Sequence, residues 1–170
     1  HKGAWLYHQG RALFYLRLYK NRHTHTHMGH THTRCHGSPG FIAIFTQAYR
    51  VFGADRYLSA AKLTATFTAE KGVLTKGMQI CHGVSGNIYM MLDLYRESKD
   101  PEVLSQALSM LFVALKTPQL SDPQVWESYD CLPGSIWTTS SFGLSLLASD
   151  ILKHPNDLDN VSLVAFGRVW

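Results

Sequence analysis

A six-residue motif occurs twice in this chain and limits how the chain can fold. Cys35–Gly40 and Cys81–Gly86 both read CHGxxG, and their first residues lie 46 positions apart. Each copy precedes two segments with helical spacing of apolar residues, so one repeat has the length of a helical hairpin. A weaker third copy at Tyr129–Gly134 places its last glycine 48 residues after Gly86. Because one hairpin cannot bury its own apolar face, the repeat predicts stacked hairpins.

The spacing of apolar residues predicts an all-α protein, with no alternating run long enough for a buried strand. The expected helices cover residues 4–20, 41–51, 56–70, 87–95, 101–115 and, less regularly, 135–152. Gly53 and Gly72 are expected to end the second and third helices, and Pro101 suits a first helical turn. Residues 117–134 hold three of the six prolines and are expected to form a loop.

Four of the expected helices have an apolar stripe that we expect to face the core. The side chains of these stripes are Phe41, Ile44, Phe45, Ala48 and Val51, then Tyr57, Ala60, Ala61, Leu63 and Phe67, then Ile88, Met91, Leu92 and Tyr95, and finally Leu104, Leu108, Leu111, Phe112 and Leu115.

Composition excludes several classes of protein. The 16 Lys and Arg residues exceed the 12 Asp and Glu residues by a scattered net charge of +4, so we expect no nucleic-acid partner. Three cysteines are too few for a disulfide scaffold and indicate a reducing compartment. The chain contains no run of about 18 apolar residues, so no membrane span is predicted. Because the chain begins at His1 and holds few repeats, we expect it to be part of a longer protein.

The repeated motif suggests a metal site. Neighbouring side chains on a regular helix point about 100° apart, so Cys81 and His82 can share a metal only at a turn or helix start, which the adjacent glycines permit. With Cys35 from the previous hairpin, two thiolates and one imidazole suit Zn²⁺ with an open fourth position. Alternatively, each cysteine is a buried apolar residue. His36 could replace Cys35 as a ligand or donate a hydrogen bond to one.

The segments RCHGSPG, KGMQICHGVSGN and YMMLDLYR resemble the lanthionine synthetase C-like (LanC-like) proteins, specifically their eukaryotic branch. The resemblance is densest over residues 34–97 and fades by residue 137. It implies part of an α/α toroid of six or seven stacked hairpins, with Cys35, Cys81 and His82 as zinc ligands. It also implies that Lys76 contacts glutathione, although a solvated lysine in a glycine-flanked loop explains this residue equally well.

Three features depart from the family pattern. Arg34 stands where the family usually has Trp, and Cys131 stands where the third repeat normally has Gly, so Asp130 is only a loose match. The family's general acid/base His and its acidic partner are expected upstream of this chain, so no catalytic residue is assigned within it.

The expected organisation has three parts. Residues 1–33 comprise the first helix and a low-complexity His-Thr tract outside the family pattern, 34–137 form the zinc-binding hairpin region, and 138–170 form a divergent tail. Five histidines in the tract could collect metal ions. Alternatively, the tract is a translated simple repeat without a fold.

The resemblance implies a zinc-dependent protein that binds glutathione and adds its thiolate to dehydroamino acids in proteins or peptides. We expect the complete protein to be this enzyme and the isolated chain to be inactive. The alternatives are a non-catalytic module that binds zinc and glutathione, or an inactive truncated product that lacks the upstream acid/base. We expect a cytoplasmic protein, and peripheral association with the plasma membrane is an alternative.

Overall fold

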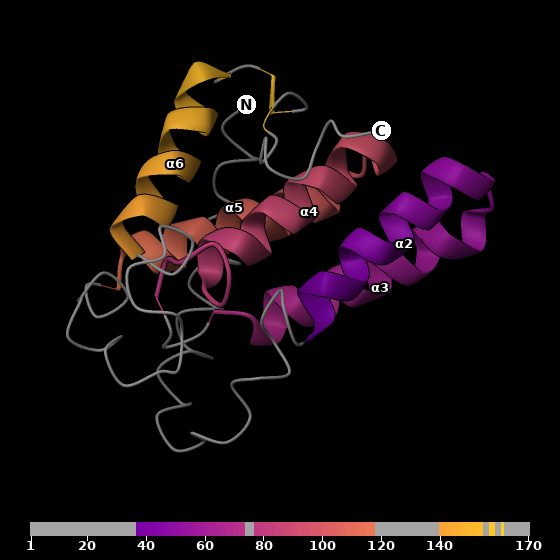
Figure 1. Cartoon of the computed structure of the whole chain (residues 1–170), viewed down its shortest axis with the longest axis horizontal. Coiled ribbons are helices and arrows are strands. Elements are labelled where there is room, and N and C mark those ends of the chain that lie inside the picture. The colour runs from indigo at the N-terminus through magenta and orange to yellow at the C-terminus, as the bar shows by residue number, and fades with distance from the viewer. Residues whose placement is uncertain (1–36, 74–76, 118–139, 155–156, 159–160, 162–170) are drawn as a thin grey trace.

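The computed structural model describes residues 37–73, 77–117, 140–154, 157–158 and 161, and the regular structure of these residues is α-helical without strands (Figure 1). The helices are α2 (Ser38–Phe52), α3 (Asp55–Lys71), α4 (Val84–Ser98), α5 (Pro101–Leu115) and α6 (Ser140–Lys153). The predicted all-α class is confirmed. The helix expected at 4–20, the His-Thr tract and the loop from residue 118 to 134 lie outside the described residues.

The sequence repeat is also a structural repeat. Helix α2 starts at residue 38 and α4 at residue 84, while α3 starts at residue 55 and α5 at residue 101, so both pairs keep the 46-residue offset. Each hairpin turns through a two-residue connection whose first residue is left-handed, with φ 64° at Gly53 and 51° at Lys99. The predicted ends at Gly53 and Gly72 and the start at Pro101 are therefore confirmed.

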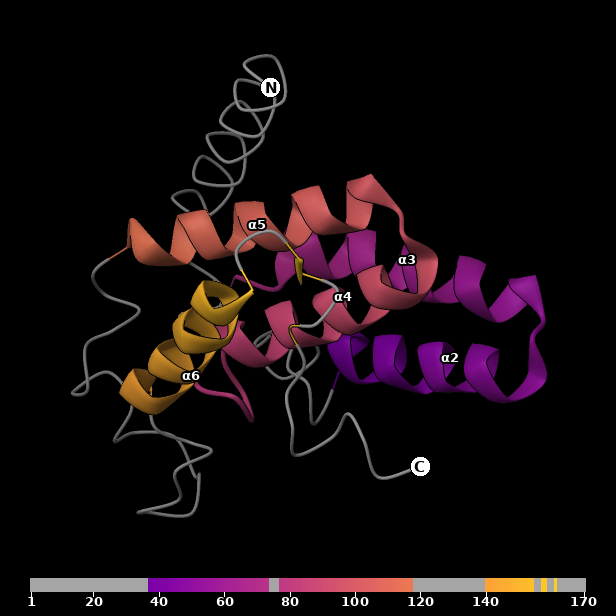
Figure 2. The ribbon, with the colours of Figure 1, turned by 90° about the horizontal axis from the view of Figure 1, so that it is seen from above.

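The two hairpins stack in register. Helix α2 packs on α3 within the first hairpin and on α4 in the second, and α3 packs on α5. Helix α6 extends this order by packing on α4 (Figure 2). The result is one layer formed by α2, α4 and α6 and another formed by α3 and α5, as expected for part of an α/α toroid.

Helix α4 forms the centre of the core. Its residues 84–92 are buried without interruption, and Leu94 is buried as well. Ion pairs reinforce its contact with α2, because the Arg50 guanidinium lies 3.0 Å from Asp93 Oδ1 and 2.7 Å from Glu97 Oε1. The second copy of the CHGxxG motif therefore leads directly into the most buried helix of the described structure.

Most of the α2 face that the sequence predicted to be buried is exposed, although Phe45 and Ala48 are partly buried. Ile44 is 60% exposed, and Phe41 and Val51 are exposed as well, whereas Ile42 is 0% exposed and Thr46 is buried with it. Helix α2 carries apolar residues on both of its sides, so periodicity alone could not decide which side packs on α3 and α4. The prediction for this face was wrong for that reason.

The buried faces of α3 and α5 also differ from the predicted stripes. In α3, Ala61 of the predicted stripe is buried, but Leu63 and Phe67 are exposed, and small residues fill the contact with neighbouring helices. The buried residues of α3 are Ala61, Ala65, Thr68 and Ala69. In α5, Leu115 is exposed and Leu104 and Leu111 are only partly buried. The buried apolar residues of α5 are Val103, Ala107, Met110, Val113 and Ala114. Small side chains let the helix backbones approach closely, which favours them at the contact over larger leucines.

The prediction for α4 was confirmed for three of its four residues, because Ile88, Met91 and Leu92 are fully buried. None of the described helices is both long and apolar enough to cross a membrane.

Candidate metal centre

Cys81 and His82 lie in a tight turn that ends where α4 begins. Residues 80–82 form the turn, and Gly83 caps the helix in an extended conformation. Two backbone hydrogen bonds fold the preceding segment onto the helix start, from Val84 N to the Gly77 carbonyl at 2.8 Å and from Gly86 N to the Gln79 carbonyl at 3.4 Å. The predicted bend at the motif is therefore confirmed.

The glycines of this motif are required by close backbone contacts. A Cβ atom at Gly83 would lie 2.4 Å from Gln79 N and 2.4 Å from the Gly77 carbonyl oxygen. A Cβ atom at Gly86 would lie 1.9 Å from the Ile80 carbonyl oxygen. Both contacts are with backbone atoms, which cannot swing aside as a side chain can. Any larger residue at positions 83 or 86 would therefore push the turn away from α4.

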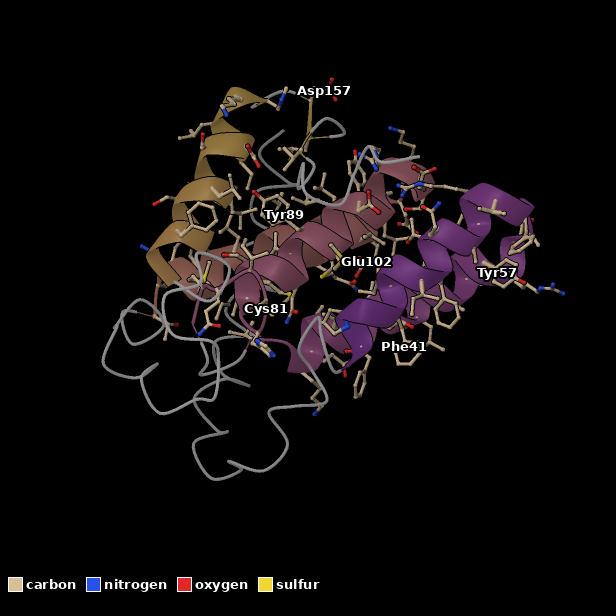
Figure 3. All side chains as sticks on the ribbon, in the orientation of Figure 1. Phe41, Tyr57, Cys81, Tyr89, Glu102 and Asp157 are labelled. Atoms are coloured by element: carbon tan, nitrogen blue, oxygen red, sulfur yellow. The ribbon has the colours of Figure 1, made fainter. Side chains whose placement is uncertain are left out.

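The turn is anchored by its neighbours in the sequence. Met78 and Ile80 are each 1% exposed and belong to the hydrophobic core, and Val84 on the far side of the turn is also buried. Cys81 and His82 between them are only partly buried. Figure 3 labels Cys81 in the turn before α4. The two polar side chains thus lie at the edge of the core and remain accessible to a ligand or solvent.

The chemistry of this pair fits a zinc ion. A cysteine sulfur and an imidazole nitrogen are both ligands that Zn²⁺ favours, and here consecutive residues supply them from one anchored turn. The turn also lies next to the N-terminus of α4, where the helix dipole favours negative charge such as that of a thiolate. Within the described ranges no group of three or more His, Cys, Asp or Glu side chains is close enough to hold a metal.

The remaining residues predicted for the site lie outside the described structure. These are Cys35 as a metal ligand, His36 as its alternative and Lys76 as a glutathione contact. Their roles remain predictions. Of the three predicted metal ligands the structure describes Cys81 and His82, which are consecutive in the sequence and lie in the same turn.

The sequence did not predict that α6 packs against the segment before the Cys81–His82 turn. A Cβ atom at Gly143 would lie 1.8 Å from the Met78 carbonyl oxygen, so α6 packs directly on the backbone that leads into the turn. Helix α6 is also tied to α4 by a hydrogen bond of 2.6 Å that the Tyr89 hydroxyl donates to Asp150 Oδ2. Burial raises the pKa of Tyr89 above its ordinary value, and the hydrogen bond to the carboxylate makes a second, smaller contribution in the same direction. A glycine inside an otherwise helical pattern was the available signal for Gly143.

Comparison with known proteins relates this chain to one family. The model of a family described as lanthionine synthetase C-like protein matches residues 15–117, which is more than half of the chain. A zebrafish (Danio rerio) protein named glutathione S-transferase LANCL1 is 44% identical over 73 residues, which are 43% of this chain. The match covers 18% of that relative, so the chain spans less than a fifth of its length.

Proposed function

Because this chain belongs to the lanthionine synthetase C-like protein family, we propose that it is part of a zinc-dependent protein that binds glutathione and adds the glutathione thiolate to dehydroamino acids in peptides or proteins. The observation that carries this proposal is the anchored turn that presents Cys81 and His82 together at the edge of the core. The name of the zebrafish relative supports glutathione as the thiol.

In this proposal Cys81 and His82 hold zinc together with Cys35. When bound there, zinc supplies a positive charge that stabilises a thiol ligand as its thiolate near neutral pH. The chain's own contribution is to fix two ligands on one rigid turn, so that their donor atoms need little reorganisation on binding. Lys76, which precedes the second motif by five residues, supplies a cation for a glutathione carboxylate.

The proposed addition balances without a leaving group. The glutathione sulfur forms a bond to the β-carbon of the dehydroamino acid, and the electron pair of the carbon–carbon double bond moves to the α-carbon. A proton then adds at the α-carbon. We assign no proton donor among the described residues, because the general acid/base is expected in a part of the protein beyond this chain.

Metal content tests the zinc site. We expect about one zinc per 170-residue chain, and a loss of that zinc in the Cys81→Ala variant, measured by inductively coupled plasma mass spectrometry. Cys131→Ala is the matched control because Cys131 is not among the proposed ligands, and it should keep its zinc. Equal zinc in the wild type and in Cys81→Ala would refute the site.

A second measurement tests the reaction. The complete protein that contains this chain is incubated with glutathione and a dehydroalanine peptide, and the peptide should gain the mass of one glutathione faster than in a protein-free control. Glutathione binding without any such gain would refute the transferase function and favour a binding module.

A further inference from the structure

We propose that Gly143 of α6 is a positioning residue for the Cys81–His82 turn. Helix α6 presses on the backbone that leads into the turn, and only glycine at position 143 allows this approach. The expected effect on zinc binding rests on the proposed function. The contact between Gly143 and the Met78 carbonyl does not depend on zinc.

Two glycines hold the segment before the turn from two sides. A Cβ atom at Gly143 would meet the Met78 carbonyl oxygen at 1.8 Å and Gln79 Cα at 3.1 Å. On the other side, a Cβ atom at Gly86 would meet the Ile80 carbonyl oxygen at 1.9 Å. Residues 78–80 therefore lie directly between the backbones of α6 and α4.

Helix α6 has an anchor that does not depend on Gly143. The Tyr89 hydroxyl donates a hydrogen bond to Asp150, which lies about two turns along α6 from Gly143. Leu147, between these two positions, is 0% exposed and belongs to the core. A side chain added at residue 143 would therefore force α6 and residues 78–80 apart, and because α6 is held by its own contacts, part of this displacement falls on residues 78–80.

Such a displacement reaches the proposed ligands within three residues. Met78 precedes Cys81 by three positions, and Ile80 is its immediate neighbour. Metal sites tolerate changes of only about 0.2 Å in ligand distance, and losing a group that orients a ligand typically costs about 10–100-fold in metal affinity. The packing of α6 on this segment is thus expected to set the geometry of both ligands.

The experiment compares Gly143→Ala with wild type in the 170-residue chain. Zinc affinity, measured by competition with a chelator, should fall about tenfold or more. In the metal-free protein, the alkylation rate of Cys81 by iodoacetamide should rise several-fold, as followed on its tryptic peptide by mass spectrometry. Ser145→Ala, an exposed position on the same helix, is the matched control and should change neither value.

Ile42→Val separates positioning from general destabilisation. This change weakens the core in α2, away from the described contacts of the turn, so it should lower thermal stability and leave the alkylation rate of folded Cys81 unchanged. If Gly143→Ala does not fold, Tyr89→Phe loosens the other end of α6 and should also raise that rate.

The outcomes distinguish this inference from the function it rests on. An unchanged alkylation rate in Gly143→Ala, or in Tyr89→Phe where Gly143→Ala is unfolded, overturns the positioning role. A wild-type chain that binds no zinc refutes the proposed function, yet the alkylation rates still decide whether α6 positions the turn.

Discussion

Two isoleucines in α2 show how differently neighbouring apolar residues contribute to stability. Ile42 is 0% exposed in the contact between helices, whereas Ile44, two residues later, points away from that contact. Burial and the cavity left on truncation determine the cost of removing an apolar side chain. The exposed residue therefore makes a matched control for the buried one.

We predict that Ile42→Ala lowers the free energy of unfolding by about 2–5 kcal/mol. The same substitution at Ile44 should change it by less than about 0.5 kcal/mol. Urea denaturation followed by circular dichroism at 222 nm measures both. Equal losses would mean that both side chains are buried in solution, contrary to the face described for α2.

The same pair explains which part of the core could be predicted from the sequence. Helix ends were predictable because the signals are local, as at Gly53 and Pro101, where one residue sets the backbone conformation. The buried side of α2 was not, because Phe41 and Ile44 make a stripe as apolar as the side that packs. Choosing between two apolar sides needs the position of the neighbouring helix.

The candidate site likewise has features that could be predicted from the sequence and one that could not. The bend at Cys81 and His82 followed from the adjacent glycines, and proposing this pair as ligands needed no long-range information. The role of Gly143 could not be predicted, because its contact with Met78 joins segments 65 positions apart (143 − 78). The packing of α6 on α4 brings those two backbones together.

At the scale of the element, the repeat itself points to a position that could be improved. Gly53 and Lys99 end equivalent helices with the same left-handed backbone, and both amides donate to the carbonyl four residues earlier, at Tyr49 and Tyr95 respectively. Glycine adopts this conformation without the contact between Cβ and the following carbonyl oxygen that penalises other residues. The first hairpin thus has the favourable residue and the second does not.

Lys99→Gly is therefore expected to raise the free energy of unfolding by about 0.5–1 kcal/mol, since relief of the left-handed strain exceeds the added entropy of the unfolded chain. Thermal denaturation followed by circular dichroism measures the change. Lys99→Ala removes the same side chain but keeps the Cβ, so it should give no gain. A loss of the same size in both variants would show that the lysine side chain matters more than the backbone.

At the scale of the whole molecule, a hydrogen bond joins α6 to the stacked hairpins, in addition to its packing. Tyr89 is 1% exposed, and its hydroxyl donates to Asp150 at 2.6 Å. Burial and this neighbouring carboxylate raise the pKa of Tyr89 above its ordinary value of 10.0. The folded protein thus retains this proton at a pH where the unfolded chain loses it, and stability must fall as pH rises above the ordinary value.

We predict that stability conferred by Tyr89 is present below pH 10 and is lost as the pH rises further. Tyr89→Phe should lower the free energy of unfolding by about 1.5–3 kcal/mol at neutral pH. As the pH rises above 10, the free energy of unfolding of this variant should fall less steeply than that of the wild type. Urea denaturation between neutral pH and pH 11 gives both slopes. Parallel slopes for the two proteins would contradict the raised pKa of this residue.

The order of helices along the chain also bears on how the structure assembles. The two-residue connections within the hairpins make most of their packing local in sequence, and such contacts form quickly because little chain entropy opposes them. The contact between Tyr89 and Asp150 instead closes a span of 61 residues. Docking of α6 is therefore expected to be the late event in folding. The Cys81–His82 turn would then reach its final shape only at that last step, after the helices around it have formed.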